Sequence, residues 1–193
     1  ILLLSKVKAC FFMYNRIQCV QYLFLWEKRM KHLYLIGGTM GVGKTTVCQK
    51  LKRLLPNSVF LDGDWCWDAD PFQVTDETKK MVLDNICHLL NNFLACSVYE
   101  NVIFCWVMHQ QEIIDDILER LKTEDIEIHT VSLLCDRNSL CQRLEKDIAQ
   151  GIRQADIEER SLARLSLYEQ LNTVKIDTSQ KSPEEIAGII AIL

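Results

Sequence analysis

The chain has 193 residues, which is enough for one domain that buries about 70% of its unfolded surface around a single core. Its hydrophobic fraction of 49% and charged fraction of 25% exclude a disordered or fibrous protein. The formal net charge of −4 argues against a nucleic-acid partner, because a broad nucleic-acid-binding surface needs many Lys and Arg side chains to neutralise phosphates.

The nine cysteines are spread along the chain without a C-x-x-C pair, and most of them lie inside apolar runs. Cysteines in this pattern usually pack as small reduced side chains, and the pattern does not indicate zinc ligands or disulfides. We therefore expect a cytoplasmic protein.

Residues 1–29 form an apolar leader that Lys6, Lys8 and Arg16 interrupt. No uncharged stretch reaches the ~20 residues of a membrane span, and the sequence has no signal-peptide cleavage pattern. Met30 directly precedes the first predicted strand, so we expect it to be the natural start and residues 30–193 to form the domain. An amphipathic accessory helix or a membrane-surface tether is the alternative for the leader, although we expect no membrane partner.

From residue 33 onwards, short β-type runs alternate with segments of helical periodicity. This alternation predicts an α/β fold in three layers, with a parallel sheet between helices on both faces. The predicted strands are 33–36, 58–61, 102–107, 128–134 and 174–176. The predicted helices carry apolar stripes within 47–55, 82–93, 113–121, 140–148 and 186–193, and a capping box opens the last helix at Ser182.

The first predicted strand leads into Gly38–Thr45, which matches the phosphate-binding pattern G-x-x-x-x-G-K-[ST] and opens a predicted helix. Glycines let successive N–H groups face phosphate oxygens, and the helix N-terminus adds the positive end of its dipole. We expect Lys44 to reach the β- and γ-phosphates and the Thr45 hydroxyl to ligate Mg²⁺. The predicted nucleotide-binding residues are Gly38, Thr39, Met40, Gly41, Val42, Gly43, Lys44, Thr45 and Thr46.

Two carboxylates, Asp62 and Asp64, directly follow the second predicted strand. Residues just past the carboxyl ends of parallel strands line the ligand crevice of such folds. We expect Asp62 to be the Mg²⁺ partner and Asp64 to be the catalytic base that orients the acceptor hydroxyl. The alternative is a simple turn. Trp65 and Trp67 flank these carboxylates and either wall an acceptor pocket or belong to the core.

The end of the third predicted strand carries Cys105 and no acidic residue. Metal binding is therefore expected to rest on Thr45, Asp62 and the nucleotide. His109 follows shortly afterwards as a possible base, but a lone histidine at such a turn is more often a loop or capping residue.

The segment after the fourth predicted strand carries several arginines on and beyond a predicted helix that begins near Asp136. Arginines on a mobile lid stabilise the transferring phosphoryl group, and we expect Arg143 and Arg153 to act as catalytic residues in this way. The alternative is a solvated helix with Arg/Glu pairs, which residues 158–160 resemble. The loop 177–179 is a weaker candidate for contacts with the adenine edge.

These motifs together resemble the small P-loop kinases, a group that includes nucleoside monophosphate, shikimate, gluconate and adenylylsulfate kinases and chloramphenicol phosphotransferase. The resemblance covers residues 33–193 and rests on Leu61–Asp64, on the Leu140-x-x-Arg143 start of a lid helix and on Lys175–Ser179. It implies the strand order 2-3-1-4-5, and the equivalent Asp-x-Asp of shikimate kinase supplies a metal partner and then an acceptor contact. The acceptor segment 65–77 matches none of these enzymes. The whole sequence looks closest to bacterial proteins labelled as nucleotide kinases or AAA-type ATPases.

We therefore expect a kinase, with MgATP as the donor and ATP and Mg²⁺ as its ligands, acting as a monomer or homodimer. Its acceptor is expected to be a small molecule, either a nucleotide or a sugar-like metabolite. The alternative from a different class is an ATPase or nucleotide-dependent switch that acts on a protein partner.

Overall fold

Five parallel strands form the centre of the structure, a computed structural model that describes residues 30–153 and 156–193. The strands are β1 (Lys31–Gly38), β2 (Ser58–Asp62), β3 (Asn101–Cys105), β4 (Ile126–Leu134) and β5 (Val174–Asp177). Their order across the sheet is β2-β3-β1-β4-β5, which confirms the predicted order 2-3-1-4-5. The predictions for residues 1–29 lie outside the described residues.

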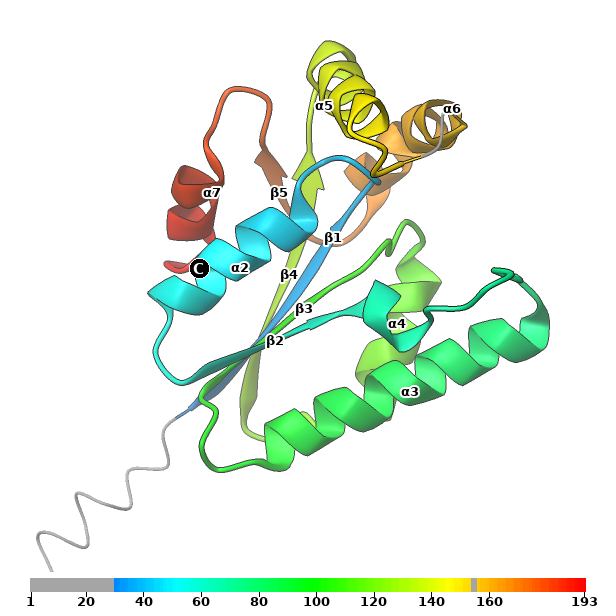
Figure 1. The fold of residues 1–193 in the computed structure, drawn as a ribbon. Coiled ribbons are helices and arrows are strands. Elements are labelled where there is room, and N and C mark those ends of the chain that lie inside the picture. The colour runs from blue at the N-terminus through cyan, green and yellow to red at the C-terminus, as the bar shows by residue number, and fades with distance from the viewer. Residues whose placement is uncertain (1–29, 154–155) are drawn as a thin grey trace, which may run out of the picture. The chain divides into compact units, whose positions relative to one another are not determined.

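Helices cover both faces of the sheet and lie beyond one of its ends (Figure 1). The α-helices are α2 (Lys44–Leu54), α3 (Asp76–Ala95), α4 (Gln111–Arg120), α5 (Arg137–Ala149), α6 (Ile157–Ala163) and α7 (Pro183–Ile190), and the 3₁₀ helices are η1 (Gly63–Cys66) and η2 (Leu165–Gln170). α2 and α7 cover one face, α3 and α4 cover the other, and α5 and α6 lie beyond the carboxyl ends of the strands. The predicted three-layer α/β fold is confirmed.

The apolar stripes of the helices pack against the sheet, as their periodicity predicts. Val47 and Leu51 of α2 join Ile186 of α7 in the core on one face, whereas Ile86 of α3 and Ile117 of α4 belong to the core on the other face. β1 lies between β3 and β4, so its residues 33–38 are buried from both sides. This central strand therefore holds the loop that follows it in a fixed place.

Side-chain caps define where the helices near the site begin. Ser182 and Glu185 form the predicted capping box of α7, in which the Ser182 N–H donates to Glu185 Oε2 at 2.8 Å and the Glu185 N–H donates to Ser182 Oγ at 3.2 Å. Asp136 caps α5 by accepting from the Ser139 N–H at 2.8 Å. These caps satisfy N–H groups that a helix leaves without a backbone partner.

Strand β3 ends at Cys105, whereas the sequence predicts a strand through Val107. Cys105 pairs with Ile36 of β1 and with Asp62 of β2, and both neighbouring strands end within two residues of these pairs. Because β2 ends at Asp62, residues after Cys105 have a neighbouring strand only on the β1 side, where the Trp106 N–H still donates to the Ile36 carbonyl at 3.3 Å. The chain turns instead and brings the Trp106 ring onto Gly63.

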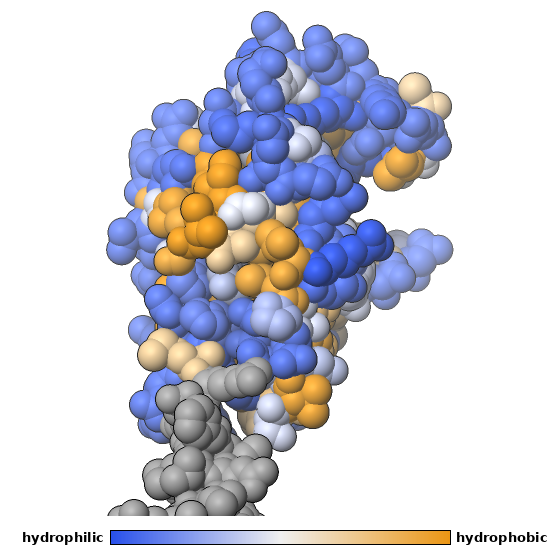
Figure 2. Space-filling view, turned by 90° about the vertical axis from the view of Figure 1, so that its left-hand side faces the viewer, coloured by the Kyte–Doolittle hydropathy of each residue, from blue (hydrophilic) through white to orange (hydrophobic). Residues whose placement is uncertain are grey.

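The face on which α7 and the C-terminus lie carries a patch of hydrophobic residues among hydrophilic ones (Figure 2). The exposed large hydrophobic residues of the described chain include Leu54, Ile192 and Leu193, of which Ile192 is 85% exposed. No helix within residues 30–153 and 156–193 combines the length and the hydropathy that crossing a membrane requires.

Candidate active site

The loop between β1 and α2 requires glycine at positions where its backbone turns. Gly41 has a φ of 83° and Gly43 a φ of 105°, a region that residues with a side chain rarely adopt. A Cβ on Gly41 would lie 2.5 Å from Leu144 Cδ2, so α5 packs directly on the loop backbone. Gly43 also precedes α2 without a side-chain cap. The first N–H groups of α2 therefore face a space that suits an anion.

Lys44 folds back over this loop. Its Nζ donates to the carbonyl oxygens of Gly38 at 2.8 Å and of Thr39 at 3.1 Å. Burial of the ammonium group lowers the pKa of Lys44, and the nearby Asp64 and Asp62 carboxylates oppose that shift. The lysine is thus a cation held at the mouth of the loop by two carbonyl groups that a phosphate can replace.

Thr45 and Asp62 meet directly beneath the loop. The Thr45 hydroxyl donates to Asp62 Oδ2 at 2.7 Å, and the other oxygen of Asp62 accepts from the Asp64 N–H at 3.2 Å. Asp62 is only 5% exposed. One hydroxyl and one carboxylate beside a phosphate-binding loop are the hard oxygen ligands that Mg²⁺ takes together with phosphates and water, so this pair fits Mg²⁺.

Asp64 extends into the same cavity from η1. Desolvation by the surrounding protein raises the pKa of Asp64, the charge of Asp62 adds to this shift, and Lys44 and a hydrogen bond from Trp106 oppose it. A Cβ on Gly63 would lie 2.5 Å from Trp106 Cγ, so the ring presses on the backbone that carries Asp64. The carboxylate is therefore positioned by packing and is more basic than an ordinary aspartate.

A cavity of about 510 Å³ joins these groups to the segment after β4. Its lining includes the predicted residues Met40, Gly41, Val42, Gly43, Lys44, Thr45, Thr46, Asp62, Asp64, Arg143 and Arg153. Gly38 and Thr39 are not part of the lining and act through their carbonyl oxygens on Lys44. Thr39 is buried, and its hydroxyl donates to the Ser161 carbonyl of α6 at 2.9 Å, which fastens the loop to that helix.

The two predicted lid arginines differ in their contacts. Arg143 Nη1 donates to the Val42 carbonyl at 3.0 Å and to Thr178 Oγ1 at 3.0 Å, while its Nη2 donates to the Thr178 carbonyl at 2.7 Å. It therefore joins the phosphate loop to the loop after β5. Arg153 forms an ion pair with Asp147 at 3.0 Å, and its charge is close enough to act on the pKa of Asp64.

The cavity lining also includes Lys146, Gln150 and Lys181, which are not among the site residues predicted from the sequence. Lys146 lies one turn after Arg143 on the same helix, so the helical period from Arg143 was a usable signal. Lys181 and Gln150 have no comparable signal in the sequence. Lys146 and Lys181 add positive charge to that of Lys44 and the two arginines, so cations outnumber carboxylates in the lining of this cavity.

His109 and Cys105 lie outside the lining of this cavity. His109 Nδ1 is 3.5 Å from the Val107 carbonyl oxygen, and burial lowers the pKa of its imidazole. Cys105 is fully buried at the end of β3, and its hydrogen bond with Cys48 and its burial raise the pKa of its thiol. Cys105 is therefore a neutral thiol at neutral pH and adds no charged metal ligand.

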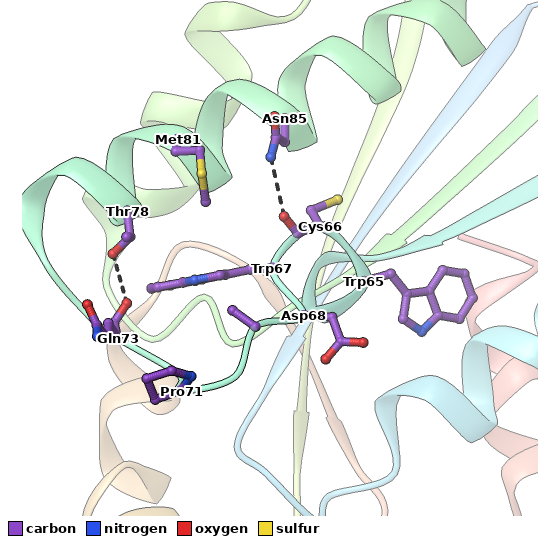
Figure 3. A pocket seen from close by; sticks show the side chains of 10 residues that line it. Trp65, Cys66, Trp67, Asp68, Pro71, Gln73, Thr78, Met81 and Asn85 are labelled. Atoms are coloured by element: carbon purple, nitrogen blue, oxygen red, sulfur yellow. Dashed lines mark hydrogen bonds between the residues drawn. The ribbon is translucent and has the colours of Figure 1, made fainter.

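A second cavity of about 610 Å³ lies on the other side of η1 and is lined by residues of the segment 65–73 and of α3 (Figure 3). Trp67 is half-buried, and its ring lies 4.6 Å from that of Phe72. Trp65 is 58% exposed and touches Phe60 edge to face at 5.3 Å, so it is not a core residue.

Residues 35–163 match the model of a protein family described as an AAA domain, and a comparison with curated proteins finds no match. Several solved structures are similar. A gluconokinase from Sinorhizobium meliloti 1021 is 18% identical over 86% of this chain and 92% of that chain, with a TM-score of 0.62. A shikimate kinase from Acinetobacter baumannii in complex with shikimate is 22% identical over 83% and 90%, with a TM-score of 0.55. The Deinococcus radiodurans tunicamycin resistance protein is 22% identical over 84% and 94%, with a TM-score of 0.60.

At these identities the solved structures show a shared fold alone, one that the gluconokinase and the shikimate kinase among them also have. The family match spans more than half of the chain and includes the second half of β1, the phosphate loop and α2, so the chain belongs to the family described as an AAA domain.

Proposed function

We propose that this protein is a kinase that transfers the γ-phosphate of MgATP to a small-molecule acceptor, either a nucleotide or a sugar-like metabolite. The observation that carries the proposal is the meeting of Lys44, the Thr45–Asp62 pair and Asp64 in one cavity. A site that only holds a nucleotide needs the first two of these elements. A carboxylate with a raised pKa beside them is the group that a hydroxyl acceptor requires.

The donor binds with its phosphates against the loop 38–45. Lys44 exchanges the carbonyl oxygens of Gly38 and Thr39 for oxygens of the β- and γ-phosphates, and Thr45 and Asp62 hold the metal side of the nucleotide. Bound Mg²⁺ supplies neutralisation of the charge on the phosphate oxygens. The cations of α5 and of the loop after β5 face the same space.

Transfer proceeds in line and without a covalent enzyme intermediate. Asp64 accepts the proton of the acceptor hydroxyl while that oxygen bonds to the γ-phosphorus and the bond to the bridging oxygen of ADP breaks. In this proposal Arg153, which lines the same cavity, stabilises the charge on the transferring group, whereas Arg143 holds the loop that binds the donor.

The test is ADP release from MgATP by the full chain, screened against pools of nucleoside monophosphates, nucleosides, sugars and hydroxy acids. The proposal predicts ADP release that depends on one pool. A slow rate that no pool changes would instead favour a nucleotide-dependent switch that acts on a protein partner.

A further inference from the structure

The second cavity lies next to η1, the 3₁₀ helix that carries Asp64, and opens between the segment after that helix and α3 (Figure 3). It is separate from the phosphate cavity, which lies on the side of η1 that faces the loop 38–45. Asp64 lines the phosphate cavity, and Trp65 and Cys66, the next two residues of η1, line the second cavity, so the helix that carries the proposed base borders both. The side chains of this cavity therefore indicate what kind of acceptor it takes.

An aromatic ring provides the main apolar surface of this cavity. Figure 3 shows the Trp67 indole running into the pocket between Met81 and Pro71, whereas the Trp65 ring, which also belongs to the lining, points away from Trp67. Phe72 packs on Trp67 with the two ring planes 40° apart and holds the indole in place. A fixed indole of this kind binds the flat or weakly puckered face of a ring compound.

Two of the polar side chains that line the cavity, Asp68 and Gln73, have hydrogen-bonding capacity to spare. Asn85 donates to the Cys66 carbonyl at 3.3 Å and Thr78 donates to the Gln73 carbonyl at 3.0 Å, so both already serve the local fold. Within the described part of the chain, the Asp68 carboxylate and the Gln73 side-chain amide have no such bond. These two groups are suited to the hydroxyls of a ligand.

Charge separates this cavity from its neighbour. Its lining carries no Lys, Arg or His, and its charged side chain is Asp68. The cations of the region, Lys44, Lys146, Arg153 and Lys181, line the phosphate cavity instead. A phosphate or carboxylate on the acceptor would face Asp68 without a counter-ion, and removing such a group from water without a partner is unfavourable.

We infer that the acceptor is a hydroxylated ring compound without an anionic group, bound with one ring face on Trp67 and with hydroxyls on Asp68 and Gln73. This inference rests on the proposed kinase function; it keeps the sugar-like class of acceptor, extends it to nucleosides and excludes a nucleotide. It favours a nucleoside or a neutral sugar over a nucleoside monophosphate or a sugar acid.

The experiment compares matched acceptors with the full chain and MgATP. Each of the four ribonucleosides is paired with its 5′-monophosphate, and glucose and N-acetylglucosamine are paired with their 6-phosphates. ADP release gives kcat/KM for each compound. We expect at least one uncharged member to be used, and to exceed its anionic partner by ~10-fold or more, as one uncompensated like charge at short range implies.

Two sets of variants connect this preference to the cavity. Gln73→Lys supplies a cation and is expected to lower the ratio of uncharged to anionic kcat/KM at least ~5-fold, whereas Gln73→Met has a similar length without the charge and leaves the ratio unchanged. Trp67→Leu is expected to raise KM for the acceptor ~10-fold and to leave KM for ATP unchanged.

Preferred use of an anionic member of a pair would overturn this inference while leaving the kinase function standing. A lack of ADP release with every member, together with a slow acceptor-independent rate, would overturn both. An effect of Gln73→Met equal to that of Gln73→Lys would also contradict the inference, because it would show that shape and not charge sets the preference.

Discussion

Replacing Gly41 by alanine tests the contact between the phosphate loop and α5. The new Cβ would lie 2.5 Å from Leu144 Cδ2 and 2.9 Å from Leu144 Cγ, at a backbone φ of 83°. The left-handed conformation costs about 1–2 kcal/mol for a residue with a side chain. Overpacking against the buried leucine adds about 1–3 kcal/mol. The free energy of unfolding is therefore expected to fall by about 2–5 kcal/mol, or roughly 4–20 °C in Tm.

Thermal and urea unfolding of the full chain measure this loss, with Gly151→Ala as the matched control. Gly151 also has a positive φ, of 69°, but a Cβ there meets no atom within 4 Å, so this variant loses only the backbone part. A Gly41→Ala/Leu144→Ala double variant removes the clash and is expected to show a favourable coupling energy. If Gly41→Ala destabilised the protein no more than Gly151→Ala, the close packing of α5 on the loop would be refuted.

Two further variants and one pH profile test the site, and a third variant tests the cap of α7. Lys44→Ala is expected to abolish turnover, because the main cation of the loop is lost, and steady-state ADP release measures it. Asp64→Asn is expected to keep MgATP binding, measured by calorimetry, but to lower transfer by roughly 10²–10⁴-fold; transfer at the wild-type rate would show that Asp64 is not the base. Because desolvation and the charge of Asp62 raise the pKa of Asp64, acceptor-dependent transfer should fall as pH drops through that raised pKa, and a wild-type profile without this acidic limb would contradict the assignment. Ser182→Ala removes the cap of α7 and should lower the free energy of unfolding by about 0.5–2 kcal/mol in urea titrations, whereas an unchanged midpoint would show that the cap contributes nothing.

The sequence predicts what depends on local patterns. The phosphate loop is a contiguous motif between a strand and a helix, and the Ser182 capping box depends on residues three apart, so both can be found without knowledge of the fold. The strand order came from a resemblance, since alternating elements by themselves allow several parallel orders.

The remaining features depend on contacts between distant segments. The bond from Thr39 to Ser161 joins residues 122 apart, and Arg143 meets the Val42 carbonyl across 101 residues. α6 has only seven residues, too few for a helical period to be evident. The early end of β3 depends on where the neighbouring strands stop, which no pattern within 102–107 records.

The same distinction applies to the candidate acceptor cavity. The sequence places Trp65 and Trp67 beside the carboxylates but does not separate their roles, because alternate residues of a turn have no fixed facing direction. Both side chains belong to the cavity lining, but the Trp67 ring runs between Met81 and Pro71, whereas the Trp65 ring points away from it. That difference arises from η1, whose single 3₁₀ turn reorients the chain after Asp62.

The most direct test of the kinase proposal follows the γ-phosphate itself. The full chain is incubated with ATP labelled at the γ-phosphorus, Mg²⁺ and the acceptor pools, and the chemical form of the label is identified after separation. The proposal predicts that the label is recovered in a phosphate ester of an organic acceptor, in amounts equal to the ADP formed. Label recovered only as inorganic phosphate, at a rate that no acceptor changes, would contradict it.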